Sequence, residues 1–273
     1  MKSLLLGGVA VAAVLAISVG PASALTQVTA TLDPFAAGLR SPLVPFTANN
    51  YTVSDFAVAT IAAPILGVST FTETGTLQLE SFKLGSATLG AAATGLRNGT
   101  GADSYGLYIT FTATGKLTTL AAGVQVGTFD TIMYSFIGDP GNHDTVTPLG
   151  LTDVGGNDIV LATGVLAAPG LGPNQASLIS GIPSADLLVT LTPVGPGIPF
   201  FALPPGLGFQ EASFTNTASV TTITVAAGVT TVTINGGGGN GTFAAVPEPA
   251  SMMLLGAGLV GVGLVRRRSA KRA

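Results

Sequence analysis

Acidic and amide side chains gather in one loop-rich stretch near the middle of the chain. Four aspartates, Asp139, Asp144, Asp153 and Asp158, are interspersed there with asparagines, glycines and two prolines. Oxygen ligands carried on turns suit Ca²⁺, so these four residues are weak candidates for a calcium site. The stretch matches no EF-hand loop, and Asp and Asn are also ordinary turn formers. A Ca²⁺ site and a set of plain turns therefore both remain open, and no other metal or cofactor is expected.

His143 is the only histidine of the chain, and it lies in the same stretch. A Ser–His–Asp hydrolase would need it as the general base, but it follows a Pro140-Gly141 turn and the chain has no G-x-S-x-G sequence. The chain also lacks cysteine, which removes thiol nucleophiles and thiolate zinc sites. Carboxylate pairs for glycoside hydrolysis stay open, although the chain has no Trp and only 4 Tyr to form sugar-stacking platforms. We expect no catalytic residue and a protein that is not an enzyme.

The N-terminus has the pattern of a secretory signal peptide, predicted as a helix within residues 1–24. Lys2 precedes an uncharged apolar run from Leu4 to Val19, and Gly20-Pro21 then breaks the helix. Small residues at Ala22 and Ala24 form an A-x-A site, which predicts cleavage by signal peptidase after Ala24. An uncleaved anchor is the alternative interpretation.

The C-terminus carries a second apolar segment. Pro247-Glu248-Pro249 is followed by an uncharged run from Ala250 to Val265 and then by the basic residues Arg266, Arg267 and Arg268. The run is shorter than the roughly twenty residues that cross a bilayer untilted, and basic residues after it favour retention at the inner membrane. The pattern predicts a short transmembrane helix with everything before it outside that membrane. A permanent single-span anchor is the alternative.

In this order, the tripeptide, the glycine-rich apolar run and the arginine cluster resemble the PEP-CTERM sorting signal. The resemblance implies that an exosortase recognises Pro247, Glu248 and Pro249 and removes the tail within residues 247–273. It also implies that the chain passes through the inner membrane only in transit and ends at the cell surface or in the extracellular matrix. Two prolines keep the tripeptide extended, which suits a cleavage site.

Between the two terminal signals, the chain is long enough for one large domain or two small ones. Residues 25–249 contain all 13 acidic residues but only Arg40, Lys83, Arg97 and Lys116 as bases, a net charge of −9. A domain this acidic is repelled by nucleic acid and by anionic lipid. We therefore expect no nucleic-acid partner.

Alternating apolar residues predict β-strands through residues 25–234. One alternation runs from Tyr105 to Phe111, and another changes phase between Leu79 and Phe82, which predicts a bulge. Threonine-rich runs on either side of Ala226-Ala227-Gly228 predict a hairpin. The expected fold is all-β, a β-sandwich-like domain flanked by the signal-peptide helix and the short transmembrane helix.

Two segments interrupt the strand pattern. The proline-rich stretch from Thr192 to Pro205 predicts a sheet edge, a long loop or a boundary between sub-domains. The glycine-rich stretch that begins at Asn235 predicts a flexible linker over residues 235–246, leading directly to the sorting signal at 247–273.

Short phrases of the domain resemble segments of the flocculation-associated PEP-CTERM proteins. The phrases are Asn49 to Phe56, Phe71 to Gly75, Ser104 to Tyr108 with Phe111 to Gly115, and Gly206 to Phe214. The resemblance implies a role in cell aggregation or biofilm matrix structure, with exopolysaccharide or cell-surface glycans as partners. A Ca²⁺-dependent carbohydrate-binding module and a secreted hydrolase are the alternatives.

Overall fold

The computed structural model describes residues 27–40, 45–148, 150–167, 174–179, 182–202, 207–214 and 220–245. The predicted signal peptide with Ala22 and Ala24, the sorting tripeptide, the C-terminal apolar run and the terminal arginines lie outside these residues. Within the described ranges, no helix is long and apolar enough to cross a membrane.

Strands make up nearly all of the regular structure in the described residues, which confirms the all-β prediction. In chain order the elements are β1 (Ala30–Leu32), β2 (Phe46–Ala48), β3 (Asn50–Ile61), β4 (Val68–Leu84), β5 (Ala87–Thr88), α2 (Ala91–Thr94), β6 (Tyr105–Ala121), β7 (Val124–Pro140), β8 (Thr145–Thr147), β9 (Gly150–Thr152), β10 (Ile159–Val165), β11 (Asn174–Ile179), β12 (Ile182–Thr190), β13 (Thr192–Pro193), α3 (Gly197–Phe200), β14 (Phe201–Ala202), β15 (Leu207–Phe214), β16 (Val220–Ala226) and β17 (Val229–Ala245).

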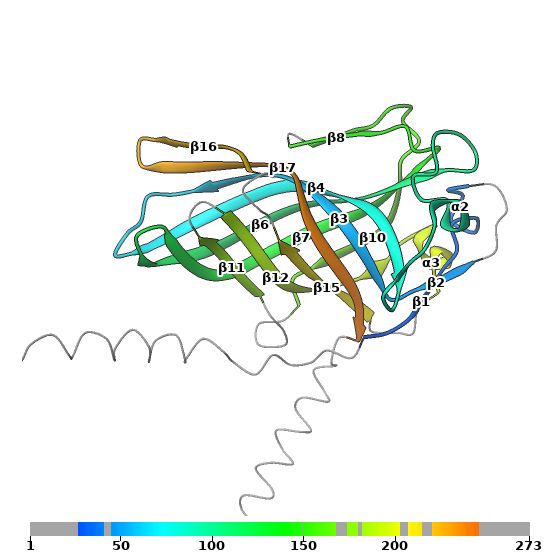
Figure 1. The fold of residues 1–273 in the computed structure, drawn as a ribbon, viewed down its shortest axis with the longest axis horizontal. Coiled ribbons are helices and arrows are strands. Elements are labelled where there is room, and N and C mark those ends of the chain that lie inside the picture. The colour runs from blue at the N-terminus through cyan, green and yellow to red at the C-terminus, as the bar shows by residue number, and fades with distance from the viewer. Residues whose placement is uncertain are drawn as a thin grey trace, which may run out of the picture.

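The long strands form one antiparallel sheet that closes on itself (Figure 1). Its order is β11-β12-β15-β17-β3-β4-β6-β7, and the first part of β7, Val124 to Thr128, returns to pair with β11. The later part of β7, Met133 to Gly138, pairs with β10 instead. A sandwich has two separate sheets that face each other across the core. Here the two facing walls belong to one continuous sheet, because hydrogen bonds between strands join them along both sides.

Strand β3 shows how the sequence sets the two faces of the sheet. Its alternate side chains Tyr51, Val53 and Ala57 are buried in the core, whereas the side chains between them are more accessible. On the outer face, side chains with hydroxyl groups pair across strands. The Thr52 hydroxyl lies 2.8 Å from the Ser81 hydroxyl of β4. Threonine therefore supplies strand propensity where water is accessible, as the sequence predicts.

The predicted hairpin and the predicted bulge are both confirmed. Strand β16 pairs with β17 through a two-residue turn in which Ala227 has φ 49° and Gly228 has φ 79°. Positive φ at both positions is the geometry of a type I′ turn, which matches the twist of the flanking strands. Thr52 of β3 lies opposite Ser81 of β4, but the next residue, Val53, lies opposite Leu79. Glu80 of β4 therefore has no partner in β3 and forms the bulge. This bulge lets Leu79 and Phe82 both face the core.

The proline-rich stretch forms an edge and a cap rather than a boundary between sub-domains. Strand β13 is the last strand of the sheet order, pairing with β10 alone, and its Pro193 has no N–H to donate to a further strand. Helix α3 then brings Phe200 and Phe201 into the core, with ring centroids 4.7 Å apart. Together with the small sheet β14-β1-β2, these residues close one end of the core.

The predicted linker at residues 235–246 is wrong over its described part. Residues 235–245 continue strand β17, which pairs with β3 on one side and with β15 on the other. Glycine is needed at position 241 because an aromatic ring covers it. A Cβ on Gly241 would lie 1.8 Å from Cζ of Tyr51, whose ring also packs against Phe243 at 5.7 Å between centroids. The glycine run is therefore part of a strand in which the Tyr51 ring covers Gly241, although the composition of the run resembles that of a linker.

Candidate functional site

The four aspartates named from the sequence lie on the loops that connect β7 to β10. Asp139 is near the end of β7, and its Oδ2 accepts hydrogen bonds from the backbone N–H groups of His143 (2.6 Å) and Asp144 (2.9 Å). These two bonds hold the turn at Gly141 and Asn142, where φ is positive at both residues. The turn brings Asp144 back toward the strand from which Asp139 projects.

Three of the four predicted aspartates converge. One carboxylate oxygen from each of Asp139, Asp144 and Asp158 lies within 4.8 Å of the others. Asp153 stays outside this group, because its Oδ1 accepts the backbone N–H of Gly156 at 2.8 Å and so stabilises a turn. The sequence therefore predicts the right loop, but it does not separate the three converging carboxylates from the one that forms the turn.

The converging carboxylates raise one another's affinity for protons. Burial raises the pKa of Asp158 to about 7, with further contributions from a hydrogen bond to Asp144 and from its negative charge. Burial also raises the pKa of Asp139, against the two backbone hydrogen bonds that it accepts. The pKa of the Tyr108 phenol is raised by burial and by the charges of the same carboxylates. The cluster, Asp139, Asp144 and Asp158, is therefore a concentrated negative charge beside a buried tyrosine.

His143 has the turn role that the sequence indicates. Its ring packs on Gly141, where an added Cβ would lie 2.2 Å from the imidazole Cε1. The ring also borders an open depression of about 480 Å³, whose other lining residues include Phe35 and Arg40. Phe35 is 53% exposed, so the depression offers an aromatic face and a basic side chain next to the acidic cluster.

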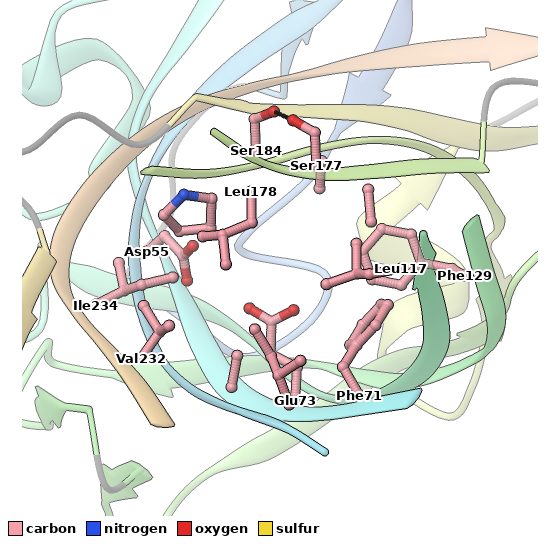
Figure 2. Close-up of a pocket in the computed structure, with 15 residues that line it drawn as sticks. Asp55, Phe71, Glu73, Leu117, Phe129, Ser177, Leu178, Ser184, Val232 and Ile234 are labelled. Carbon is pink, nitrogen blue, oxygen red and sulfur yellow. Dashed lines mark hydrogen bonds between the residues drawn. The ribbon is translucent and has the colours of Figure 1, made fainter. Parts of the chain in front are cut away.

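Two carboxylates that the sequence analysis did not single out lie inside the closed sheet. Asp55 of β3 and Glu73 of β4 point into the enclosed space, as Figure 2 shows. Asp55 is 5% exposed. Burial raises the pKa of Glu73 from 4.5 to about 7. The sequence contains a signal for both residues. In each strand the acidic residue occupies one of the alternate positions that are otherwise mostly apolar and face the core.

The interior around these carboxylates is apolar and nearly filled. Two adjoining cavities of about 50 and 70 Å³ share Asp55, Glu73 and Phe129, and apolar side chains dominate their linings. Each has room for a few water molecules but is well below the several hundred Å³ of a typical small-molecule pocket. The interior is therefore a packed core that holds two carboxylates rather than a large binding cavity.

Exposed apolar side chains gather at the hairpin end of the closed sheet. Leu66 is 99% exposed and Ile65 78% exposed in the β3–β4 turn. The turns that carry these side chains are neighbours. The backbone N–H of Thr119 donates to the Gly67 carbonyl at 3.0 Å, a Cβ on Gly228 would lie 3.2 Å from Ala63, and Ile179 is paired with Val124. We call this surface the distal rim, and its members are Ile65, Leu66, Leu120, Ile179, Ile223 and Val225.

Strand β16 adds a free strand edge to the distal rim. Among the described strands it pairs with β17 alone, and it stands apart from the rest of the closed sheet in Figure 1. Residues 222–226 are exposed on both faces, and the strand sequence VTTITVA has no charge and no proline. Exposed edges of this kind are templates for pairing with another chain, and charged residues or prolines usually block them.

Comparison with known proteins finds a match at the C-terminus. Residues 245–268 match the PEP-CTERM protein-sorting motif. No curated protein and no solved structure matches the chain. The predicted sorting signal is therefore confirmed, and the chain is an exported protein targeted to an exosortase. The resemblance to flocculation-associated proteins stays a prediction.

The sorting motif adjoins the folded domain directly. Strand β17 ends at Ala245, the residue at which the matched motif begins. Ala245 is still paired with Leu207 of β15, so the hydrogen-bonded ladder extends to within two residues of Pro247. Val28 donates to the Phe243 carbonyl at 2.9 Å, which places the start of the described chain at the same end of the sheet. The first and last described residues of the chain therefore lie at one end of the sheet, and the distal rim lies at the other.

Proposed function

We propose that the protein is a non-enzymatic adhesive component of the cell surface or extracellular matrix that promotes cell aggregation by associating with further copies of itself. The observation that carries this proposal is the placement of the distal rim and of the β16 edge at the end of the sheet opposite the sorting signal. Strand β17 alone has 17 residues, which at about 3.3 Å per residue gives it a contour length of roughly 50 Å between the two ends. A copy held at its sorting end presents the distal rim outward.

The charge distribution favours the distal rim over other surfaces for contact between copies. The net charge of −9 in residues 25–249 opposes association in general. The segments that carry the distal rim, residues 61–70, 117–127, 174–179 and 220–235, contain no charged residue. Two copies that meet end to end therefore bring apolar surface together and keep their acidic regions apart.

Strand β16 is suited to pairing with its own copy. In an antiparallel pair centred on Ile223, Thr222 of one copy faces Thr224 of the other, and the two Ile223 residues face each other. Cross-strand pairs of β-branched residues stabilise such a ladder, and the absence of charge removes like-charge repulsion. The pairing is isologous, so it joins two copies with a two-fold axis.

A lysine at Val225 tests the proposal. Val225 is 70% exposed, so Val225→Lys leaves the core of the domain unchanged and places a charge on the distal rim. Cells that produce this variant are expected to aggregate less than cells that produce the wild-type protein, at equal surface amounts measured by antibody labelling. Val160→Lys is the matched control, because Val160 is 45% exposed on β10, away from the distal rim. Equal aggregation of the Val225→Lys and wild-type cells contradicts the proposal.

The depression beside His143 supports a second candidate, a carbohydrate-binding module. Phe35 offers a face for stacking on a sugar ring, and the largely buried Arg40 lines the same depression. This candidate predicts retention of the protein on immobilised exopolysaccharide and its loss in Phe35→Ala. Retention that is unchanged in Phe35→Ala removes it, whatever the result at Val225.

A further inference from the structure

The acidic cluster holds three carboxylate oxygens that are buried without a hydrogen-bond partner among the described residues. Asp139 is 0% exposed, and its Oδ1 has no hydrogen-bond partner among the described residues. Oδ2 of Asp144 and Oδ1 of Asp158 are likewise buried, and while both carboxylates are ionised no donor group in the described part of the chain bonds to them. An unsatisfied buried acceptor costs about 1–3 kcal/mol, and more when it is charged. Three such atoms close together therefore favour the binding of a cation.

The spacing of the cluster fits a cation. Ca²⁺ binds carboxylate oxygens at about 2.3–2.6 Å, so ligands on opposite sides of the ion lie roughly 5 Å apart. The three carboxylates offer oxygens within 4.8 Å of one another, which places all of them on one such coordination sphere. The cluster contains no His and no Cys, the ligands that Zn²⁺ prefers. An all-oxygen set on a loop favours Ca²⁺ over smaller ions that need rigid octahedral geometry.

The backbone already holds the most buried ligand in place. Asp139 uses Oδ2 to accept the N–H groups of His143 and Asp144, which leaves Oδ1 for a ligand. Asp144 likewise uses Oδ1 to accept the Val154 N–H at 2.8 Å and keeps Oδ2 unpartnered. In both residues one oxygen fixes the orientation of the side chain and the other remains for a ligand. Such preorganisation is typical of a binding site.

From these observations we propose that Asp139, Asp144 and Asp158 bind one Ca²⁺ ion, which fastens the loop between β7 and β10 to the end of the sheet. The chain between Asp144 and Asp158 carries the β8–β9 hairpin, so an ion bound by both residues closes the base of this excursion. The site lies at the end of the sheet where β17 ends. The end of β7 pairs with the start of β6, which pairs with the last part of β4, and β4 and β17 both end beside the start of β3. The ion stabilises this end of the exported protein. This proposed Ca²⁺ site does not depend on the association between copies that is proposed for the distal rim.

Terbium luminescence and thermal unfolding of the purified full-length chain test the site. Tb³⁺ occupies Ca²⁺ sites and emits when a neighbouring tyrosine is excited, and Tyr108 is the tyrosine whose pKa the cluster raises. The wild-type protein is expected to give sensitised Tb³⁺ emission that Ca²⁺ displaces. Its Tm is expected to rise with CaCl₂ and saturate, with a Kd on the order of 10⁻⁴ to 10⁻³ M, as for extracellular calcium modules.

Four variants make the result specific. Asp158→Asn is expected to weaken Ca²⁺ binding at least tenfold, and Asp144→Asn replaces it as the test variant if Asp158→Asn does not fold. Asp130→Asn, at an exposed salt bridge with Lys116, is the matched control and keeps wild-type binding. Tyr108→Phe loses the sensitised emission and keeps the Ca²⁺-dependent rise in Tm. A wild-type Tm that does not respond to CaCl₂ up to about ten times that Kd, or equal effects of Asp158→Asn and Asp130→Asn, overturns the proposal.

Discussion

Replacing Glu73 by glutamine tests the description of the interior. Burial among apolar side chains raises the pKa of Glu73 from 4.5 to about 7 in the folded protein. The folded state therefore binds the proton more tightly than the unfolded state does. The contribution of Glu73 to stability is highest below pH 4.5, falls as the pH rises toward 7, and is constant above that.

The size of the effect follows from the same pKa difference. A pKa raised by about 2.5 corresponds to roughly 3 kcal/mol of lost stability above pH 7. Because the adjoining cavities have room for water, which solvates the charged form, this value is an upper limit. Glutamine has the shape of the protonated acid and no charge. Glu73→Gln is therefore expected to be more stable than the wild type at pH 8, by up to about 3 kcal/mol, and nearly equal to it at pH 4.

Urea unfolding followed by far-ultraviolet circular dichroism at pH 4, 6 and 8 measures this difference. Comparing the variant with the wild type at each pH cancels the titration of groups that do not interact with Glu73. Glu80→Gln is the matched control, because Glu80 is exposed and its ion pair with Arg97 spans 3.6 Å, so its effect stays within about 1 kcal/mol at every pH. A Glu73→Gln protein that is less stable than the wild type at pH 8, or whose difference from it is the same at pH 4 and pH 8, refutes the reasoning.

Two further predictions follow from the structure. Gly241→Ala is expected to lower the free energy of unfolding by about 1–3 kcal/mol, because the new methyl group must displace the Tyr51 ring. In the same urea assay, Gly90→Ala has open space around the added Cβ and should change stability little, and equal effects of the two substitutions contradict the strand assignment of residues 235–245. Cell aggregation mediated by the distal rim is expected to increase between 10 mM and 0.5 M NaCl, since salt screens the repulsion between acidic domains. Turbidity or settling measurements check this, and aggregation that falls with salt indicates an ionic contact instead.

The sequence was informative where one residue type has one structural meaning. Alternating apolar residues predict the long strands, and the change of phase between Leu79 and Phe82 predicts the bulge. Glycine was ambiguous, because the run from Gly236 to Gly241 has the composition of a linker. Its structural role depends on Tyr51, which is distant in sequence and covers Gly241 only once β3 and β17 pair.

The candidate sites show the same division. The loop that carries the aspartates was predicted, but the convergence of Asp139, Asp144 and Asp158 depends on how β7 and β10 bring the ends of that loop together. The sequence contained the evidence for the interior position of Asp55, because this acidic residue follows Tyr51 and Val53 at the alternate positions of β3 that face the core. The closure of the sheet was not, because the pairing of β7 with β11 joins segments whose register no local pattern specifies.

The most direct test of the account is the mass of the native protein recovered from the cell surface or culture medium. If an exosortase processes the chain at the matched motif, peptide mapping finds a C-terminus between Val246 and Ala250, and the peptides that contain Arg266, Arg267 and Arg268 are missing. Recovery of the exported protein with its tail intact through Arg268 contradicts the account.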